Sequence, residues 1–357
     1  MSQATLETNE TTDASARRLQ NRVLGFIAAP SLPDFDSLAL DVHGYQYRSN
    51  PAYQRFVDRL GSPLPRAWRE IPAVPAEAFR MSVLACGPAE RVYRSSGTTA
   101  GLERRAEHHV PDVEVYRAAA LAGFARAVLP KGVRRRFLVA APEHATHPSS
   151  SLGDMVSWLR ESYDDDSVPS FLGADGVDVE RLAHVLERVG STAPVVVLAV
   201  TLALLRLVDW AECRGRRFLL PSASLVIDTG GCKGYERDLP RADVLASYRR
   251  VFGIAPEQIV NEYGMTELGS QLYARGDGPL RPPPWLRVVV TDLATGDDVP
   301  NGEVGCLRFF DLANLGSVVA IQTEDVGRVS DGGIELLGRA PGAVTRGCSL
   351  LASGDRA

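Results

Sequence analysis

The chain has 357 residues, of which 45% are hydrophobic, and its formal net charge is −5 at pH 7. A chain of this length can bury a substantial core, and its acidic balance argues against a broad nucleic-acid-binding surface. The sequence has no apolar run of about 18 residues, so we expect no membrane span. The five cysteines are widely spaced and form no C-x-x-C pair, which favours a reducing, cytoplasmic location.

The composition divides the chain into three parts. Residues 1–16 are polar and contain no apolar segment, so they predict a disordered tail and not a signal peptide. Residues 17–284 begin with helical, proline-broken stretches and continue as alternating strands and helices, which indicates an α/β core. After the prolines at 282–284, β-rich runs separated by turns predict a smaller antiparallel β subdomain with a tail over residues 285–357.

A stretch rich in hydroxyl side chains and glycine follows a short predicted strand that ends near Tyr93. Glycine lets backbone N–H groups approach an anion, and serine and threonine hydroxyls add further donors. The stretch therefore predicts a phosphate-binding loop, with a flexible surface loop of the same composition as the alternative. Its residues are Ser95, Ser96, Gly97, Thr98, Thr99 and Gly101, followed by Arg104 and Arg105.

Short apolar runs and amphipathic stretches alternate through the middle of the chain. The apolar runs lie at 137–141, 195–200 and 225–227, and helices are predicted between and after them. This alternation predicts a largely parallel sheet flanked by helices. Ligands bind at the carboxyl ends of the strands in such sheets, where the phosphate-binding loop, a loop at 142–152 and a Gly-Gly turn at 230–231 are all expected.

The loop at 142–152 holds two histidines, His144 and His147, three residues apart. Histidine pairs can bind a metal ion, but no third ligand stands at a suitable spacing and Pro148 follows directly. We interpret this loop as lining a substrate site.

Five short motifs follow one another along the chain in a specific order. They are Ser-Ser-Gly-Thr-Thr-x-Gly at 95–101, Gly-Gly at 230–231, Tyr-Gly-x-Thr-Glu at 263–267, Thr-x-Asp-x-Gly at 323–327 and Gly-Arg at 338–339. In this order they resemble the core motifs of the adenylate-forming superfamily, which includes the acyl-CoA synthetases. The Asp-Thr-Gly-Gly-x-Lys-Gly turn and the Arg-Gly-Cys-Ser-Leu ending are most similar to the LuxE-like acyl-protein synthetases. The resemblance implies the α/β fold of the N-terminal part of adenylate-forming enzymes.

The resemblance also implies an ATP site with Mg²⁺, in which a carboxylic acid is converted to an acyl-AMP. The phosphate-binding loop would contact the β- and γ-phosphates, Thr266 the α-phosphate, and Glu267 would hold Mg²⁺. Tyr263 would stack on adenine, Asp325 would bind the ribose hydroxyls, and Arg339 would reach the ribose or phosphate side. The backbone near the nucleotide would be that of Gly230, Gly231 and Gly264. Taken singly, such residues commonly serve as packed aromatics, turn formers and surface ion pairs.

The departures from the superfamily concern the later step. The chain stops at Ala357, where larger relatives continue into a mobile lid, so the resemblance implies an enzyme without that lid. In LuxE-like proteins the acyl group passes to a cysteine near the C-terminus and then to a partner, and Cys348 occupies a matching place. The partner would be a reductase or a carrier protein. The alternatives are transfer to coenzyme A or a carrier, as in phenylacetate-CoA ligases, and nucleotide binding without turnover.

Overall fold

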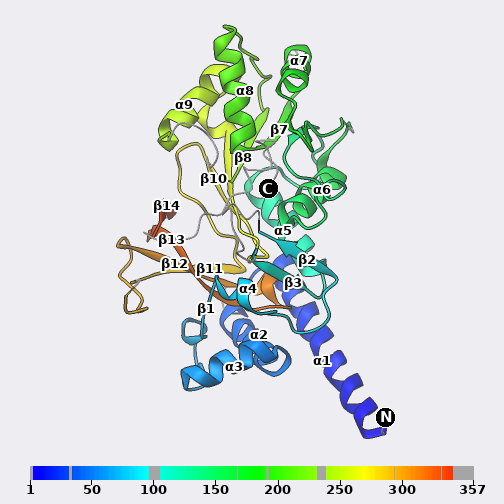
Figure 1. The fold of residues 1–357 in the computed structure, drawn as a ribbon, viewed down its shortest axis with the longest axis vertical. Coiled ribbons are helices and arrows are strands. Elements are labelled where there is room, and N and C mark those ends of the chain that lie inside the picture. Colours follow the sequence, from blue (N-terminus) through cyan, green and yellow to red (C-terminus); the bar gives the residue numbers. More distant parts are fainter. Residues whose placement is uncertain are drawn as a thin grey trace.

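The structure is a computed structural model that describes residues 3–31, 34–95, 105–166, 168–189, 193–230, 239–292, 294–330 and 332–340, with side chains in the first helix from Ala14 onward. Its largest core surrounds a sheet built from β4 Arg136–Ala140, β7 Val195–Val200, β8 Leu225–Thr229, β9 Ile259–Tyr263 and β10 Leu272–Arg275. The strand order is β10-β9-β8-β7-β4. Figure 1 labels β7, β8 and β10 of this sheet. All are parallel to their neighbours except β10, which is antiparallel to β9.

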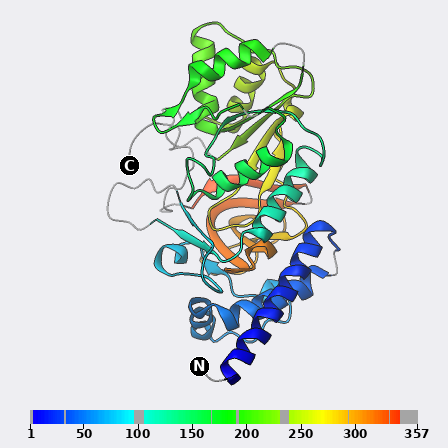
Figure 2. The same cartoon turned by 90° about the vertical axis from the view of Figure 1, so that its right-hand side faces the viewer.

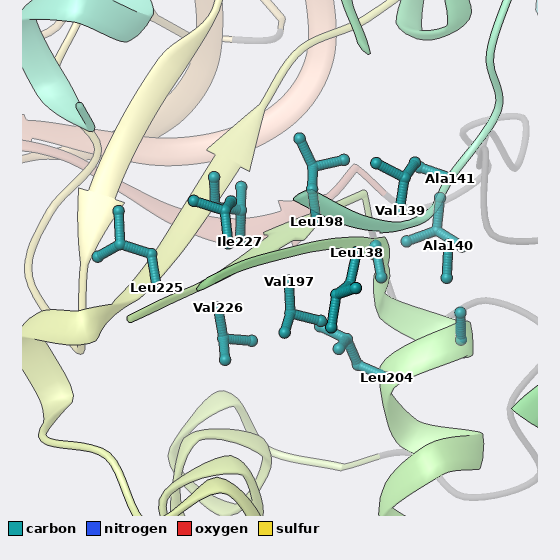
Figure 3. Packing of buried hydrophobic residues seen from close by; sticks show 14 of the residues in the cluster. Leu138, Val139, Ala140, Ala141, Val197, Leu198, Leu204, Leu225, Val226 and Ile227 are labelled. Atoms are coloured by element: carbon teal, nitrogen blue, oxygen red, sulfur yellow. The ribbon is translucent and has the colours of Figure 1, made fainter. Parts of the chain in front are cut away.

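Both faces of this sheet are buried. Every residue of β7 and β8 is buried, which is the reason for the apolar runs at 195–200 and 225–227. The register aligns Leu138, Val197 and Val226 on one face, with Leu204 beneath them (Figure 3). The covering helices are α5 Glu114–Ala127, α6 Ser151–Tyr163, α7 Val179–Val189, α8 Thr201–Cys213 and α9 Arg241–Phe252. The predicted, largely parallel sheet flanked by helices is confirmed.

A second sheet is formed mostly by the C-terminal part of the chain. Its strands are β1 Val74–Pro75, β11 Leu286–Thr291, β12 Val304–Asp311, β13 Ala320–Ser330 and β14 Gly333–Arg339. The order is β1-β13-β12-β11, and β14 pairs with the C-terminal half of β13. All these pairings are antiparallel except that of β1 with β13. The predicted smaller antiparallel unit is therefore present, and it also takes one short strand from the N-terminal region.

The N-terminal helices pack on the second sheet. They are α1 Gln3–Ala28, α2 Asp34–Ser49 and α3 Pro51–Leu60. The rings of Phe35 and Trp68 lie 5.9 Å apart, and Trp68 contacts Phe310 of β12 edge-on at 4.8 Å. Figure 2 shows these helices at one end of the molecule, α7 to α9 at the other, and the second sheet between them. Residues on the C-terminal side of the boundary predicted at residue 284 thus share a hydrophobic core with the first 70 residues. The boundary itself stays a prediction.

Residues 3–16 belong to α1, whereas the sequence predicts a disordered tail there. This stretch contains neither glycine nor proline, so nothing in it stops the helix that Leu19, Val23 and Phe26 anchor by their burial. Within the described ranges, no helix combines the length and apolar character that crossing a bilayer requires.

The remaining elements are short. A hairpin of β2 Arg91–Arg94 and β3 Glu107–Val110 carries the predicted phosphate-binding loop between its strands. The others are α4 Ala78–Met81, β5 Leu172–Gly173, β6 Gly176–Val177 and the 3₁₀ turns η1 Trp68–Glu70, η2 Pro256–Gln258 and η3 Leu312–Asn314.

Candidate functional site

Ser95 closes the base of the loop that joins β2 and β3. Its backbone N–H donates to the carbonyl of Ala106, and its Oγ accepts from the Ala106 N–H, both at 3.0 Å. The side chain is buried, so its hydroxyl oxygen fixes the two ends of the loop. The other predicted phosphate-binding residues lie outside the described residues: Ser96, Gly97, Thr98, Thr99 and Gly101.

Three of the predicted nucleotide-binding residues meet where the two sheets join. The hydroxyl of Tyr263, at the carboxyl end of β9, donates to Oδ2 of Asp325 on β13 at 2.6 Å. Arg339 of β14, the register partner of Asp325, donates through Nε to Oδ1 at 2.9 Å. The Tyr263 ring stacks on Phe309, with centroids 6.0 Å apart. Each carboxylate oxygen of Asp325 has more than one lone pair, so it can accept a further hydrogen bond from a ligand hydroxyl.

Two buried carboxyls that the sequence analysis missed lie at the carboxyl ends of the neighbouring strands. Glu262 of β9 accepts a hydrogen bond from the Thr229 hydroxyl, and burial raises the pKa of Glu262 to about 7. Asp228 of β8 accepts from the Thr201 hydroxyl and pairs with Arg241 at 2.5 Å. For Asp228, its place directly after the apolar run 225–227 was the available signal.

Glycines stand in the turns beside these carboxyls. Gly230 has φ +91°, in the left-handed region that favours glycine. A Cβ on Gly264 would lie 2.7 Å from Oε1 of Glu262, so the turn after β9 passes tightly over that carboxyl. Gly231 lies outside the described residues.

The backbone of Thr266 and Glu267 is held from two sides. His108 of β3 donates from Nδ1 to the Thr266 carbonyl at 2.8 Å, and Asn314 of η3 donates to the Glu267 carbonyl at 2.9 Å. Burial lowers the pKa of His108 to about 4, so this histidine is neutral near pH 7.

The Glu267 side chain is completely buried. Among the described residues no group of three His, Cys, Asp or Glu side chains could hold a metal ion. Mg²⁺ commonly binds one or two carboxylates together with substrate phosphates and water. Glu267 supplies one carboxylate of the kind that such a site uses.

The loop at 142–152 connects to a buried carboxylate. Asp154, in the first turn of α6, accepts from Nδ1 of His144 on one oxygen and from the Tyr93 hydroxyl on the other, at 2.6 Å for Tyr93. The N–H of Arg94 donates to the Ser149 carbonyl at 2.8 Å. The loop therefore lies directly against the strand that enters the predicted phosphate-binding loop. Sequence reasoning noted His144 but missed Asp154, ten residues away.

A small cavity of about 80 Å³ lies between the N-terminal helices, the β2–β3 hairpin and η3. Its walls include Gln20, His108, Asp112, Leu268 and Asn314. This volume suits a few water molecules. None of the described residues predicted to bind nucleotide lines it.

Comparison with known families identifies one match. The sequence model of the family described as acyl-protein synthetase, LuxE, matches residues 173–355, slightly more than half of the chain. A search of curated proteins gave no match.

Solved structures with a similar fold include two of 2-hydroxyisobutyryl-CoA ligase. The open conformation in complex with 2-HIB-AMP and CoA has a TM-score of 0.63 and 17% identity, covering 87% of this chain and 71% of the ligase. The postadenylation state with 2-HIB-AMP gives 0.63 and 17%, covering 87% and 69%. This likeness confirms the predicted adenylate-forming fold.

ATP-bound MatB from Rhodopseudomonas palustris also matches. Its TM-score is 0.46 at 19% identity, and the match covers 70% of this chain and 47% of MatB. The chain thus spans about half the length of MatB.

Proposed function

Because the chain belongs to the LuxE acyl-protein synthetase family, we propose that it uses ATP to convert a carboxylic acid to an acyl-AMP and then transfers the acyl group to a thiol. The first acceptor is Cys348, and the final acceptor is a partner protein, a reductase or a carrier. The acid carboxylate attacks the α-phosphate of ATP, a P–O bond forms, and pyrophosphate leaves.

The observation that carries this proposal is the junction of Tyr263, Asp325 and Arg339. It offers an anionic acceptor for ribose hydroxyls, an aromatic ring for a base, and a cation beside both, at the carboxyl end of a strand in a parallel sheet. The protein's task in phosphoryl and adenylyl chemistry is to position the reactants and balance their charge. In this proposal Asp325 binds the ribose, and Tyr263 and Arg339 orient the Asp325 carboxylate. Thr266 contacts the α-phosphate.

Mg²⁺ bound through Glu267 would neutralise charge on the phosphates. Neutral His108 and the Asn314 amide hold the backbone carbonyls of Thr266 and Glu267. They therefore fix the backbone positions from which these two side chains extend. The buried Ser95 does the same for the hairpin that presents the phosphate-binding loop.

Acid-dependent exchange of labelled pyrophosphate into ATP tests the adenylation step. We expect exchange with at least one member of a panel of short, branched, aromatic and long-chain acids. In Asp325→Asn the loss of charge-assisted hydrogen bonds should raise the KM for ATP by about 10- to 100-fold. Glu335→Gln is the matched control, because Glu335 lies on β14 with its side chain 57% exposed. An unchanged KM for ATP in Asp325→Asn would remove the assigned ribose role, and no exchange with any acid would refute adenylation.

The acceptor is tested by intact-protein mass after incubation with ATP and the best acid from the panel. We expect a stable acyl adduct that Cys348→Ser abolishes and that Cys213→Ser, the change of an exposed thiol on α8, retains. Product that forms only when coenzyme A or a carrier protein is added would instead favour a ligase of the phenylacetate-CoA type.

A further inference from the structure

The pair of His144 and Asp154 has the geometry of a proton acceptor and the group that orients it. Resting on the proposed function, we propose that His144, oriented by Asp154, removes the proton from the acceptor thiol in the acyl-transfer step. Neither residue is among those predicted to bind ATP, so the proposal assigns a separate role to the loop after β4.

The hydrogen bond fixes the tautomer of His144. A carboxylate only accepts, so the ring nitrogen that faces Asp154, Nδ1, carries the proton and Nε2 of the neutral ring carries the lone pair. The His144 side chain is 41% exposed, and among the residues that the structure describes Nε2 has no hydrogen-bond partner. The basic nitrogen is therefore available to a group that approaches from solvent.

Asp154 is held in place from several directions. Its side chain is only 2% exposed, Tyr93 donates to it at 2.6 Å, and Nε of Arg91 lies 3.6 Å from the same oxygen. The backbone N–H of His144 donates to Oγ of Ser157 on α6 at 3.0 Å, which fixes the other end of the pair. A base with a buried, hydrogen-bonded carboxylate behind it is the arrangement that activates hydroxyl and thiol nucleophiles in unrelated enzymes.

The other charged groups near the loop are paired with partners of their own. Glu143 pairs with Arg160 at 2.8 Å, and Arg94 pairs with Glu107 at 3.0 Å. The second histidine of the loop, His147, contacts the Thr146 hydroxyl at 2.9 Å and forms no ion pair with a carboxylate of the described residues. Of the two loop histidines, only His144 has both an orienting anion and an exposed second nitrogen.

The sheet places this pair at the edge where the nucleotide residues lie. The loop follows the carboxyl end of β4, and the carboxyl end of β9 with Tyr263 lies three strands away in the same sheet. Three strand spacings amount to about 14 Å, which an acyl-AMP and an incoming thiol can bridge together. The bond from Arg94 to Ser149 ties the loop to the hairpin that enters the phosphate-binding loop.

The proposed step balances without a further reactant. The thiol sulfur attacks the acyl carbonyl carbon as its proton passes to Nε2 of His144. A C–S bond forms, the C–O bond to the phosphate breaks, and AMP leaves with the electron pair. The imidazolium then releases the proton to solvent.

The test separates adenylation from transfer and uses thiols of different acidity. Pyrophosphate exchange measures the first step. Transfer is measured in a Cys348→Ser background, so that added thiols attack the adenylate directly, with N-acetylcysteamine, which is protonated at neutral pH, and 2-nitro-5-thiobenzoate, which is already a thiolate. His144→Gln should leave exchange within about twofold and slow transfer to N-acetylcysteamine by about 100-fold, because general-base catalysis contributes at least that much. Transfer to the thiolate should fall by less than about threefold, since it has no proton to lose.

Two further variants complete the design. Asp154→Asn should give the same selective loss with the alkyl thiol, and circular dichroism checks that this buried change leaves the fold intact. His184→Gln is the matched control, because His184 is exposed on α7 and its Nδ1 contacts the Glu180 carbonyl. Equal slowing with both thiols, no slowing with either, or a parallel loss of exchange in His144→Gln would overturn the proposal. Absence of exchange in the unaltered chain would instead refute the adenylation on which the proposal rests.

Discussion

At the scale of single residues, the structure explains the last position of the Thr-x-Asp-x-Gly motif. A Cβ on Gly327 would lie 2.5 Å from the backbone carbonyl oxygen of Glu335 on β14 and 3.2 Å from the Leu307 side chain. The register between β13 and β14 also shifts between Val326 and Gly327. Glycine is required there so that β14 can approach closely enough for Arg339 to reach Asp325.

Gly327→Ala should therefore move β14 away from β13 and weaken the Asp325–Arg339 contact. We expect a loss of about 1–3 kcal/mol in the free energy of unfolding, the usual cost of overpacking, measured by urea denaturation. Gly87→Ala is the control, because apart from its chain neighbours no heavy atom of the described residues lies within 4 Å of a Cβ built on Gly87. Its free energy of unfolding should change by less than about 0.5 kcal/mol. A urea midpoint equal to that of the unaltered chain would show that the close approach of β13 and β14 at Gly327 does not contribute to stability.

At the scale of elements, predictability follows the range of the interactions. Strands β7 and β8 could be predicted because burial of both faces leaves apolar runs at 195–200 and 225–227 in the sequence. The pairing of β1 with β13 could not, because two residues, Val74 and Pro75, carry no periodic signal and their partners stand about 250 positions later. The helix over residues 3–16 was missed because polar composition predicts solvation and does not by itself exclude a helix.

The candidate site shows the same limit. Resemblance to a family selected Tyr263, Asp325 and Arg339, but their hydrogen bonds join two sheets and no local pattern predicts them. The orienting carboxylate of His144 lies on the following helix, and Asp154 by itself looks like an ordinary acidic residue in a first helical turn. Residues that act through a partner from another element are the ones that sequence reasoning misses.

At the scale of the whole molecule, ionisable groups are buried on strands of both sheets and in the β2–β3 hairpin. Asp311, at the end of β12, is buried while accepting hydrogen bonds from Ser270 and the Gly269 N–H, and burial raises its pKa to about 6. Burial similarly raises the pKa of Glu262 to about 7. The pKa of His108 shifts in the opposite direction, because burial lowers it to about 4. The stability of the fold should therefore depend on pH through all three groups.

For Glu262 the direction can be worked out in full. Its folded-state pKa of about 7 lies above the ordinary glutamate pKa of 4.5, so between these pH values the folded chain holds a proton that the unfolded chain has lost. The favourable contribution is complete below about pH 4.5 and disappears as the pH rises through 7, by at most about 1.4 kcal/mol per pH unit. In Glu262→Gln the amide keeps an acceptor for Thr229 but cannot ionise. The variant should gain stability relative to the unaltered chain as the pH rises from 5 to 8, which urea midpoints at each pH will measure. Glu257→Gln, a change outside the buried core, should give no such trend. A difference between Glu262→Gln and the unaltered chain that is constant across this range would mean that Glu262 remains ionised in the fold, with Thr229 and the neighbouring backbone compensating its burial.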